Sequence, residues 1–243
     1  MLGKYELNHI YNEDSYKAIK NIPDKSIDLI VTDPPYQIEN TKAGGNSALS
    51  RSIQPMNDEL IDNDITKGID MDILNEFIRI MKNINIYIFC NHKQIPEYLD
   101  FFVSRHKCNF DILIWHKSNA MPLFNNKYLT DKEYCLYFRR NAYCNPQNYE
   151  DASTIFFDKI NISDKKHFLH PTIKPLELVK KIIRNSSKEN EIIFDAFIGS
   201  GTTAVACKEL NRQYLGFEIN KKWFDIAQDR LNGITAKGQY SLF

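Results

Sequence analysis

The chain has 243 residues, and its 31 lysines and arginines balance its 31 aspartates and glutamates, so the formal net charge is zero. With 43% hydrophobic and 26% charged residues, it matches an ordinary globular domain that can bury one substantial core. No apolar run approaches the roughly 18 residues of a membrane span. The start of the chain shows no apolar signal segment, and the five cysteines form no Cys-x-x-Cys pair. We therefore expect a cytoplasmic protein, bacterial or phage-encoded, with reduced thiols and no bound metal.

Short, nearly continuous apolar runs alternate with amphipathic stretches along the chain. The runs predict buried parallel strands at 27–31, 84–90, 112–115, 134–138, 192–194 and 214–217. The amphipathic stretches predict helices at 14–22, 71–81, 176–183, 202–210 and 222–231, the last ending at Asn232-Gly233. This alternation predicts a doubly wound α/β fold in a single domain spanning residues 1–243.

Two long polar segments and the distribution of charge indicate where a polyanion would bind. Residues 37–69 read as a mobile loop facing DNA, and residues 139–169 as an irregular insertion. Residues 103–188 carry a net charge of +7, whereas residues 1–102 carry −6, so a phosphate backbone would be attracted to the middle of the chain. The alternative is that these basic side chains only solvate helix faces. The predicted DNA contacts are Lys42, Arg51, Lys117, Arg139, Arg140, Lys165 and Lys166.

The segment Asp33-Pro34-Pro35-Tyr36 directly follows the predicted strand at 27–31. Its two prolines fix φ and cannot donate backbone hydrogen bonds, which makes the loop stiff. A base amine is a poor nucleophile because its lone pair is delocalised into the ring. If the Asp33 carboxylate and the Pro34 carbonyl accept its two hydrogens, the lone pair is oriented and the positive charge developing on nitrogen is stabilised. Tyr36 would stack on a base extruded from the duplex. The alternative is that these residues form only a turn.

A glycine-rich turn at 195–204 connects the predicted strand at 192–194 to a helix. Glycines allow close approach of a ligand, and the helix start offers free N–H groups. Glu218, about 20 residues beyond the turn, is placed to accept hydrogen bonds from ribose hydroxyls. Asp195 would repel a pyrophosphate but favour a cationic amino-acid group, which points to S-adenosylmethionine rather than NAD. The alternative is a glycine turn that serves only packing.

With these motifs, the sequence resembles the DNA amino-methyltransferases, in the permuted group often called β. The resemblance covers about residues 8–231. The catalytic loop comes first, then the recognition insertion at 139–169, then the His-Pro-Thr-Ile-Lys-Pro segment at 170–175, and the cofactor loop last. The resemblance implies a circularly permuted, mostly parallel, seven-stranded Rossmann-like methyltransferase sheet with a small recognition insertion.

The resemblance also implies roles for matching residues. It places Asp33, Pro34, Pro35 and Tyr36 in catalysis, with Asp33 also touching the cofactor; Lys174 would support the turn that contains it. The implied cofactor residues are Asp14, Ser15, His170, Thr172, Asp195, Phe197, Gly199, Ser200, Gly201, Thr202 and Glu218. Taken alone, Asp14 reads as a helix cap and His170 as a turn histidine. The family usually has proline where this chain has Ala196.

Aspartate, rather than serine, at the head of the catalytic loop favours adenine N6 over cytosine N4. The resemblance thus implies N6-methyladenine formation in DNA by base flipping, of the kind found in restriction–modification systems. The alternatives are a cytosine-N4 enzyme, an RNA amine methyltransferase and an inactive DNA-binding relative.

The chain ends in a predicted flexible tail, residues 234–243. Gln239-Tyr240-Ser241-Leu242-Phe243 resembles the peptide with which bacterial replication proteins dock on the sliding clamp. The alternative is a tail that packs on its own domain. Members of the permuted group are often dimers, so a homodimer is a further expectation.

Overall fold

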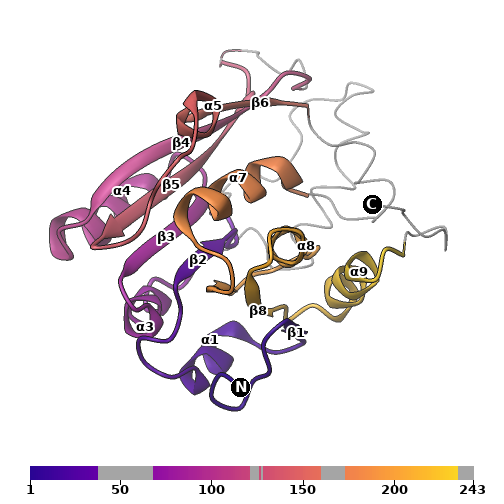
Figure 1. Cartoon of the computed structure of the whole chain (residues 1–243). Coiled ribbons are helices and arrows are strands. Elements are labelled where there is room, and N and C mark those ends of the chain that lie inside the picture. Colours follow the sequence, from indigo (N-terminus) through magenta and orange to yellow (C-terminus); the bar gives the residue numbers. More distant parts are fainter. Residues whose placement is uncertain (38–67, 121–125, 127, 160–172, 235–243) are drawn as a thin grey trace.

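The chain folds around one mixed sheet in a computed structural model that describes residues 1–37, 68–120, 126, 128–159 and 173–234 (Figure 1). The strands follow the order β1-β8-β7-β2-β3-β5-β4-β6. Their bounds are β1 (His9–Tyr11), β2 (Leu29–Thr32), β3 (Ile84–Cys90), β4 (Asn109–Lys117), β5 (Lys132–Arg140), β6 (Ile155–Asp158), β7 (Ile192–Asp195) and β8 (Gln213–Phe217). All neighbouring pairs are parallel except the two that involve β5. The predicted doubly wound, mostly parallel fold is confirmed.

Within the described residues the sheet has eight strands, not the seven expected. The two strands at its edges, β1 and β6, are short and partly exposed, and the apolar run of β6 is only the three residues 155–157. An edge strand needs burial on fewer sides, so its sequence carries a weaker hydrophobic signal. β6 lies inside the segment that was expected to be an irregular insertion.

The central strands are buried on both faces, which explains their continuous apolar sequences. In β3, Ile86 and Ile88 belong to one hydrophobic core, whereas Tyr87 and Phe89 belong to the other. Because successive side chains of a strand point to opposite faces, one strand contributes to both cores. The cores are therefore separated by the sheet.

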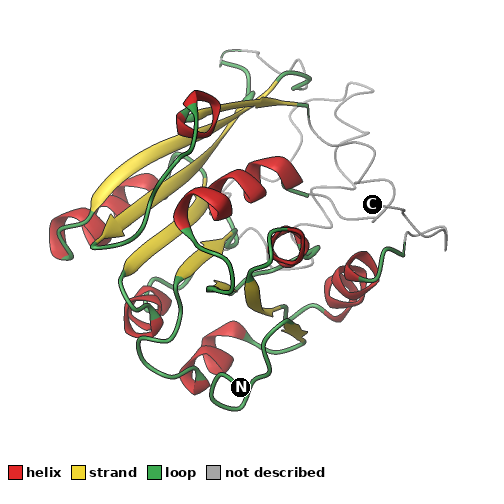
Figure 2. Cartoon of the chain, viewed as in Figure 1, coloured by secondary structure: helices red, strands yellow, loops and turns green. Residues whose placement is uncertain are grey.

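Helices cover both faces of the sheet, as Figure 2 shows. One face packs against α1 (Ser15–Ala18), the 3₁₀-helix η1 (Ile19–Asn21), α3 (Ile73–Ile80), α4 (Ile95–Leu99) and the π-helix η2 (Asp100–Arg105). The other packs against α7 (Leu176–Ser186), α8 (Thr202–Glu209) and α9 (Lys221–Leu231). The short helix α5 (Tyr149–Ala152) precedes β6. Among the described residues, none of the helices has the length and apolarity that a membrane crossing requires.

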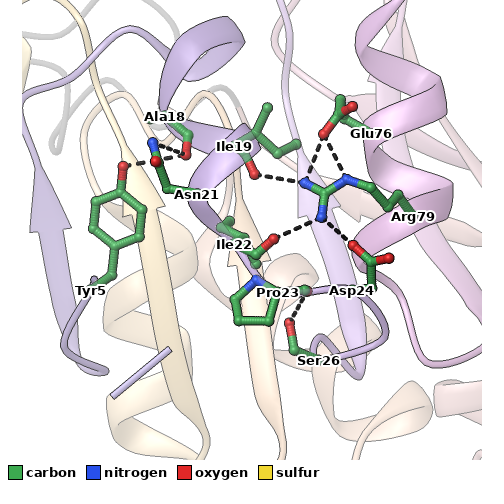
Figure 3. Close-up of polar contacts among 10 residues, drawn as sticks. All are labelled: Tyr5, Ala18, Ile19, Asn21, Ile22, Pro23, Asp24, Ser26, Glu76 and Arg79. Carbon is green, nitrogen blue, oxygen red and sulfur yellow. Dashed lines mark hydrogen bonds and ion pairs between the residues drawn. The ribbon is translucent and has the colours of Figure 1, made fainter. Parts of the chain in front are cut away.

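Arg79 on α3 fixes the turn that leads into β2 (Figure 3). Its guanidinium donates to the backbone oxygens of Ile19, at 2.9 Å, and Ile22, at 2.7 Å. It also pairs with Asp24, at 2.6 Å, and Glu76, at 2.7 Å. These contacts hold the backbone at the end of the helical turn, where the Ile19 carbonyl also accepts from the Ile22 N–H. They hold the segment before β2, and β2 in turn carries the predicted catalytic loop.

Truncating Phe138→Ala is expected to destabilise the fold by about 3–5 kcal/mol, because the ring is fully buried and leaves a cavity. Phe138 stacks on Phe102 with ring centroids 4.5 Å apart. The free energy of unfolding in urea measures the loss. Phe157→Ala is the matched control, since the Phe157 ring is 70% exposed, and it should cost under about 1 kcal/mol.

Candidate active site

A cavity opens at the carboxyl ends of β2, β7 and β8, where ligands bind in doubly wound sheets. The loop 33–36 lines one side, and residues 218–220 and most of residues 195–203 line the other. Because β5 runs antiparallel to β3, its amino end also reaches this edge and places Glu133 in the wall. Lys174, just before α7, completes the wall.

The two carboxylate oxygens of Asp33 have different contacts. Oδ2 forms a short ion pair with the Lys174 ammonium. Oδ1 is buried and has no hydrogen-bond partner among the described residues. Leaving a buried acceptor unpaired costs about 1–3 kcal/mol, so such an atom points to a ligand that supplies the missing donor. A base amine is a donor of this kind.

Glu133 connects the other polar groups of the wall. Its Oε1 accepts from the Tyr36 hydroxyl at 2.8 Å and lies 2.7 Å from the Lys174 ammonium. Its Oε2 lies 2.7 Å from the Lys117 ammonium. The Lys174 ammonium also lies 5.5 Å from the centre of the Tyr36 ring. The result is a buried network that holds Asp33 and Tyr36 together.

Burial and the shared lysine set the protonation of these acids. Burial raises the pKa of Asp33, against the attraction of the Lys174 ammonium. Burial also disfavours the charged form of Glu133, but Lys174 and Lys117 outweigh it and lower the Glu133 pKa to about 2. The two carboxylates raise the pKa of Lys174 despite its burial. At neutral pH Glu133 is therefore ionised and Lys174 protonated.

The turn after β3 supports the catalytic loop from outside the cavity. The Gln94 side-chain amide donates to the Pro35 carbonyl at 3.3 Å, and that of Asn91 donates to the Gln37 carbonyl at 2.8 Å. Gln94 is buried. These two side-chain donors therefore hold carbonyl groups of the loop in place.

The glycine turn adopts the conformations that its residues permit. Gly199 and Gly201 have φ of 52° and 79°, and Gly201 is the N-cap of α8. A Cβ on Gly201 would lie 3.1 Å from the Cβ of Ala227 on α9. Positive φ and close approach together explain glycine here. The buried Arg230 donates to the Ser200 and Thr202 hydroxyls and so holds the turn against α9.

Asp195 is buried at the end of β7, and both of its oxygens are bonded. Oδ1 accepts from the Thr32 hydroxyl at 3.0 Å and the Phe197 N–H at 3.1 Å, and Oδ2 from the Thr203 hydroxyl at 2.6 Å. Burial raises the pKa of Asp195 to about 7, and these bonds oppose the rise only in part. Asp195 therefore connects the loop of β2 to the glycine turn.

The raised pKa of Asp195 predicts a pH-dependent stability. The folded state favours the protonated acid. The contribution of Asp195 to the free energy of unfolding is therefore complete below pH 3.8, the pKa of the unfolded chain, and is lost as the pH rises through about 7. Thermal unfolding of the cofactor-free protein should show a higher midpoint near pH 5 than near pH 7. In Asp195→Asn this dependence should largely disappear. An unchanged dependence in the variant would assign it to other groups.

Glu218 follows β8 and faces the glycine turn. Its two oxygens accept from the Gly199 N–H at 3.0 Å and the Asn220 N–H at 2.8 Å. A carboxylate oxygen has two lone pairs, so each can accept a further hydroxyl. Phe197, Ile198 and the exposed Ile219 supply apolar walls beside it. This combination fits a nucleoside whose ribose hydroxyls bind the acid, with a cationic sulfonium near Asp33.

Comparisons with known proteins agree with this geometry. A family model described as DNA methylase, and named for N6 and N4 transfer, matches residues 27–229. The chain belongs to this DNA methylase family. The Type II methyltransferase M.HpaI of Haemophilus parainfluenzae is 29% identical over 247 residues, which cover 90% of this chain and 72% of that protein.

Two solved structures resemble this methylase. The crystal structure of the M1.HpyAVI–SAM complex gives a TM-score of 0.66 at 27% identity and covers 92% of this chain and 98% of that one. The PvuII DNA methyltransferase, described as cytosine-N4-specific, gives 0.67 at 14% identity, with coverage of 91% and 85%. The second likeness shows the fold alone. DNA is the substrate of the methylase, and S-adenosylmethionine is its methyl donor.

Most of the predicted catalytic and cofactor residues that the structure describes line the cavity, but Asp14, Ser15 and Gly201 do not. Asp14 caps α1 by accepting from the Tyr16 N–H at 3.0 Å, as its alternative interpretation holds. Ser15 is buried and donates to the Ala196 carbonyl, so it contacts the backbone of the glycine turn. His170 and Thr172 lie outside the described residues.

The structure describes three of the residues predicted to contact DNA, which are Lys117, Arg139 and Arg140. Arg139 and Arg140 lie at the far end of β5, opposite Asn85 and Ile84 at the amino end of β3. An antiparallel strand rising about 3.4 Å per residue puts Arg139 about 20 Å from Glu133, at the opposite edge of the sheet. The two arginines therefore lie away from the catalytic loop, and their contact with DNA stays a prediction.

Of the remaining residues predicted to contact DNA, the structure describes one, Lys117. The Lys117 ammonium pairs with Glu133. Four predicted contacts, the tail from 235 onwards and most of the loop 37–69 lie outside the described residues; the four are Lys42, Arg51, Lys165 and Lys166.

Sequence reasoning missed several residues that shape the site. Glu133 is the main one, and its only signal is a charged residue at the start of a strand. Lys174 was expected to support a turn, whereas it pairs with Asp33. The other unexpected contributors are Thr32, Phe89, Gln94, Thr203, Trp223 and Arg230.

Proposed function

We propose that the methylase transfers the methyl group of S-adenosylmethionine to the N6 amine of an adenine turned out of DNA. The observation that carries this is the buried Asp33 Oδ1, an acceptor that lacks a donor among the described residues and lies in the same wall as the Tyr36 ring. Aspartate at the head of the loop favours adenine over cytosine, as inferred from the sequence.

The residues of the chain orient the amine and do not need to deprotonate it first. Asp33 Oδ1 and the Pro34 carbonyl accept its two N–H hydrogens, which turns the lone pair toward the methyl group. The cofactor supplies that methyl as an electrophile on a sulfonium. The anionic Asp33 stabilises the charge that develops on the amine more than it stabilises the ground state. The Tyr36 ring holds the base by stacking, which contributes about 1–3 kcal/mol.

The test is to identify the modified base. DNA from cells that express the methylase is digested to nucleosides and analysed by mass spectrometry, and parallel sequencing of modified bases gives the target site. N6-methyladenine, absent from cells that express Asp33→Ala, is the expected result. N4-methylcytosine would overturn the adenine assignment but keep the family, and no new modified base in DNA would overturn the function.

We also propose three finer properties of the methylase. The tail at Gln239–Phe243 would bind a sliding clamp, and a pull-down with clamp that survives deletion of residues 239–243 would overturn this.

A homodimer would appear as twice the chain mass in sedimentation, whereas a single-chain mass at micromolar concentration would contradict it. A bacterial cytoplasmic location follows from a DNA substrate in bacterial relatives, and fractionation tests it.

A further inference from the structure

We propose that Glu133 is a positioning residue for methyl transfer. It holds Lys174 against Asp33 Oδ2, which leaves Oδ1 turned to the base, and it fixes the Tyr36 ring through the same oxygen. The inference rests on the proposed function, because it assumes that Asp33 receives a base amine. It assigns a role to a residue about 100 positions away from the catalytic loop in the sequence.

The first step of the argument is that the two oxygens of Asp33 have different environments. Oδ2 is engaged by the Lys174 ammonium, whereas Oδ1 has no partner among the described residues. A single cation on one oxygen fixes the rotation of the carboxylate about its Cβ–Cγ bond. Lys174 therefore decides which oxygen the base meets, provided that Lys174 is itself held in place.

Glu133 is what holds Lys174 in place. The Lys174 side chain is 8% exposed, and its ammonium lies 2.7 Å from Glu133 Oε1. The same oxygen accepts from the Tyr36 hydroxyl at 2.8 Å. Glu133 sits in β5, where it is paired with Trp115 of β4, so its backbone is fixed by the sheet. Glu133 thus links Asp33, through Lys174, to the Tyr36 ring.

The second step concerns charge. A buried carboxylate without a cation tends to take up a proton, and a protonated Asp33 would lose the anion that stabilises the transition state. Lys174 opposes that protonation, while Glu133 competes for the same ammonium. The described titratable groups around Asp33 are Lys174, Glu133, Tyr36, Asp195, Cys90, Tyr98 and Cys135, with Lys117 behind Glu133. Among the described groups, Lys174 is the one cation in direct contact with Asp33.

The network predicts opposite pH responses in two charge-removing variants. Lys174→Gln keeps a hydrogen-bond donor but removes the cation. The acid limb of the pH profile of kcat should therefore move to higher pH, and kcat at neutral pH should fall about 10²-fold. Glu133→Gln removes the competing anion, so the acid limb should move to lower pH while kcat falls about 10-fold because Tyr36 and Lys174 are less fixed. A merely structural role would lower both profiles without moving either limb.

The measurement is steady-state kcat for transfer from saturating tritiated S-adenosylmethionine to plasmid DNA grown without the enzyme, from about pH 5 to 9. Lys180→Gln is the matched control, because Lys180 lies on α7 and pairs with Glu177 and Glu209 away from the cavity. Circular dichroism and S-adenosylmethionine affinity report folding. If Lys174→Gln does not fold, Lys174→Arg keeps the charge and should lower kcat without moving the acid limb.

The outcomes separate this inference from the proposed function. Wild-type protein that transfers no label to DNA contradicts the proposed function. Wild-type activity combined with limbs that move in one direction, or do not move, in Lys174→Gln and Glu133→Gln overturns the role of Glu133. A shifted limb in Lys174→Arg would also overturn it, because that variant retains the cation.

Discussion

Replacing Asp33→Ala is expected to lower methyl transfer by about 10³-fold or more while the protein still binds S-adenosylmethionine. The loss follows because the variant removes the anion that orients the amine and stabilises its developing charge. Asp33 pairs with Lys174 and does not hold the glycine turn or Glu218. Single-turnover label transfer measures the first quantity, and calorimetric titration with the cofactor measures the second.

Asp33→Asn divides this loss into two parts. The amide oxygen still accepts one hydrogen bond, so this variant should retain more activity than Asp33→Ala if geometry contributes beside charge. Asp111→Asn is the control, since Asp111 is an exposed residue of β4 that does not line the cavity. Turnover near the wild-type rate in Asp33→Ala would refute the role of Asp33.

The second large effect is expected at Glu218. Glu218→Gln should weaken S-adenosylmethionine binding by about 10- to 100-fold, the magnitude of a lost hydrogen bond to a charged group. Glutamine also turns an amide donor toward either the Gly199 or the Asn220 N–H, both of which need an acceptor. Calorimetric titration of the cofactor gives the dissociation constants.

A neighbouring acid provides the comparison for Glu218. Asp225→Asn on α9 changes one exposed carboxylate, which pairs only with Lys221 among its described ion pairs, and should leave the affinity unchanged. If kcat at saturating cofactor also fell strongly in Glu218→Gln, the residue would act on the transfer step as well as on binding. Equal affinities of Glu218→Gln and the wild type for S-adenosylmethionine would show that Glu218 does not bind the cofactor.

The local chemistry of the site can be read from contiguous residues. The strand at 192–194 followed by a glycine turn predicts close approach to a ligand, and the structure gives Gly199 and Gly201 the positive φ that this requires. The predicted helix boundaries at 202 and 231 hold because capping is local: Gly201 begins α8, and α9 ends at Leu231, before Asn232 and Gly233. Strands β1 and β6 escaped prediction because each is short and partly exposed at an edge of the sheet.

The sequence by itself therefore determined the doubly wound fold, the catalytic and glycine loops and the family, since each depends on residues adjacent in the chain. Only the tertiary structure decided how those loops are held. The antiparallel direction of β5 brings Glu133 to Asp33 through Lys174 and carries Arg139 and Arg140 to the opposite edge. Strand direction and register depend on contacts between distant segments, and charge composition does not record them. The same basic segment thus supplies Glu133 and Lys174 to the active site and places Arg139 and Arg140 away from it.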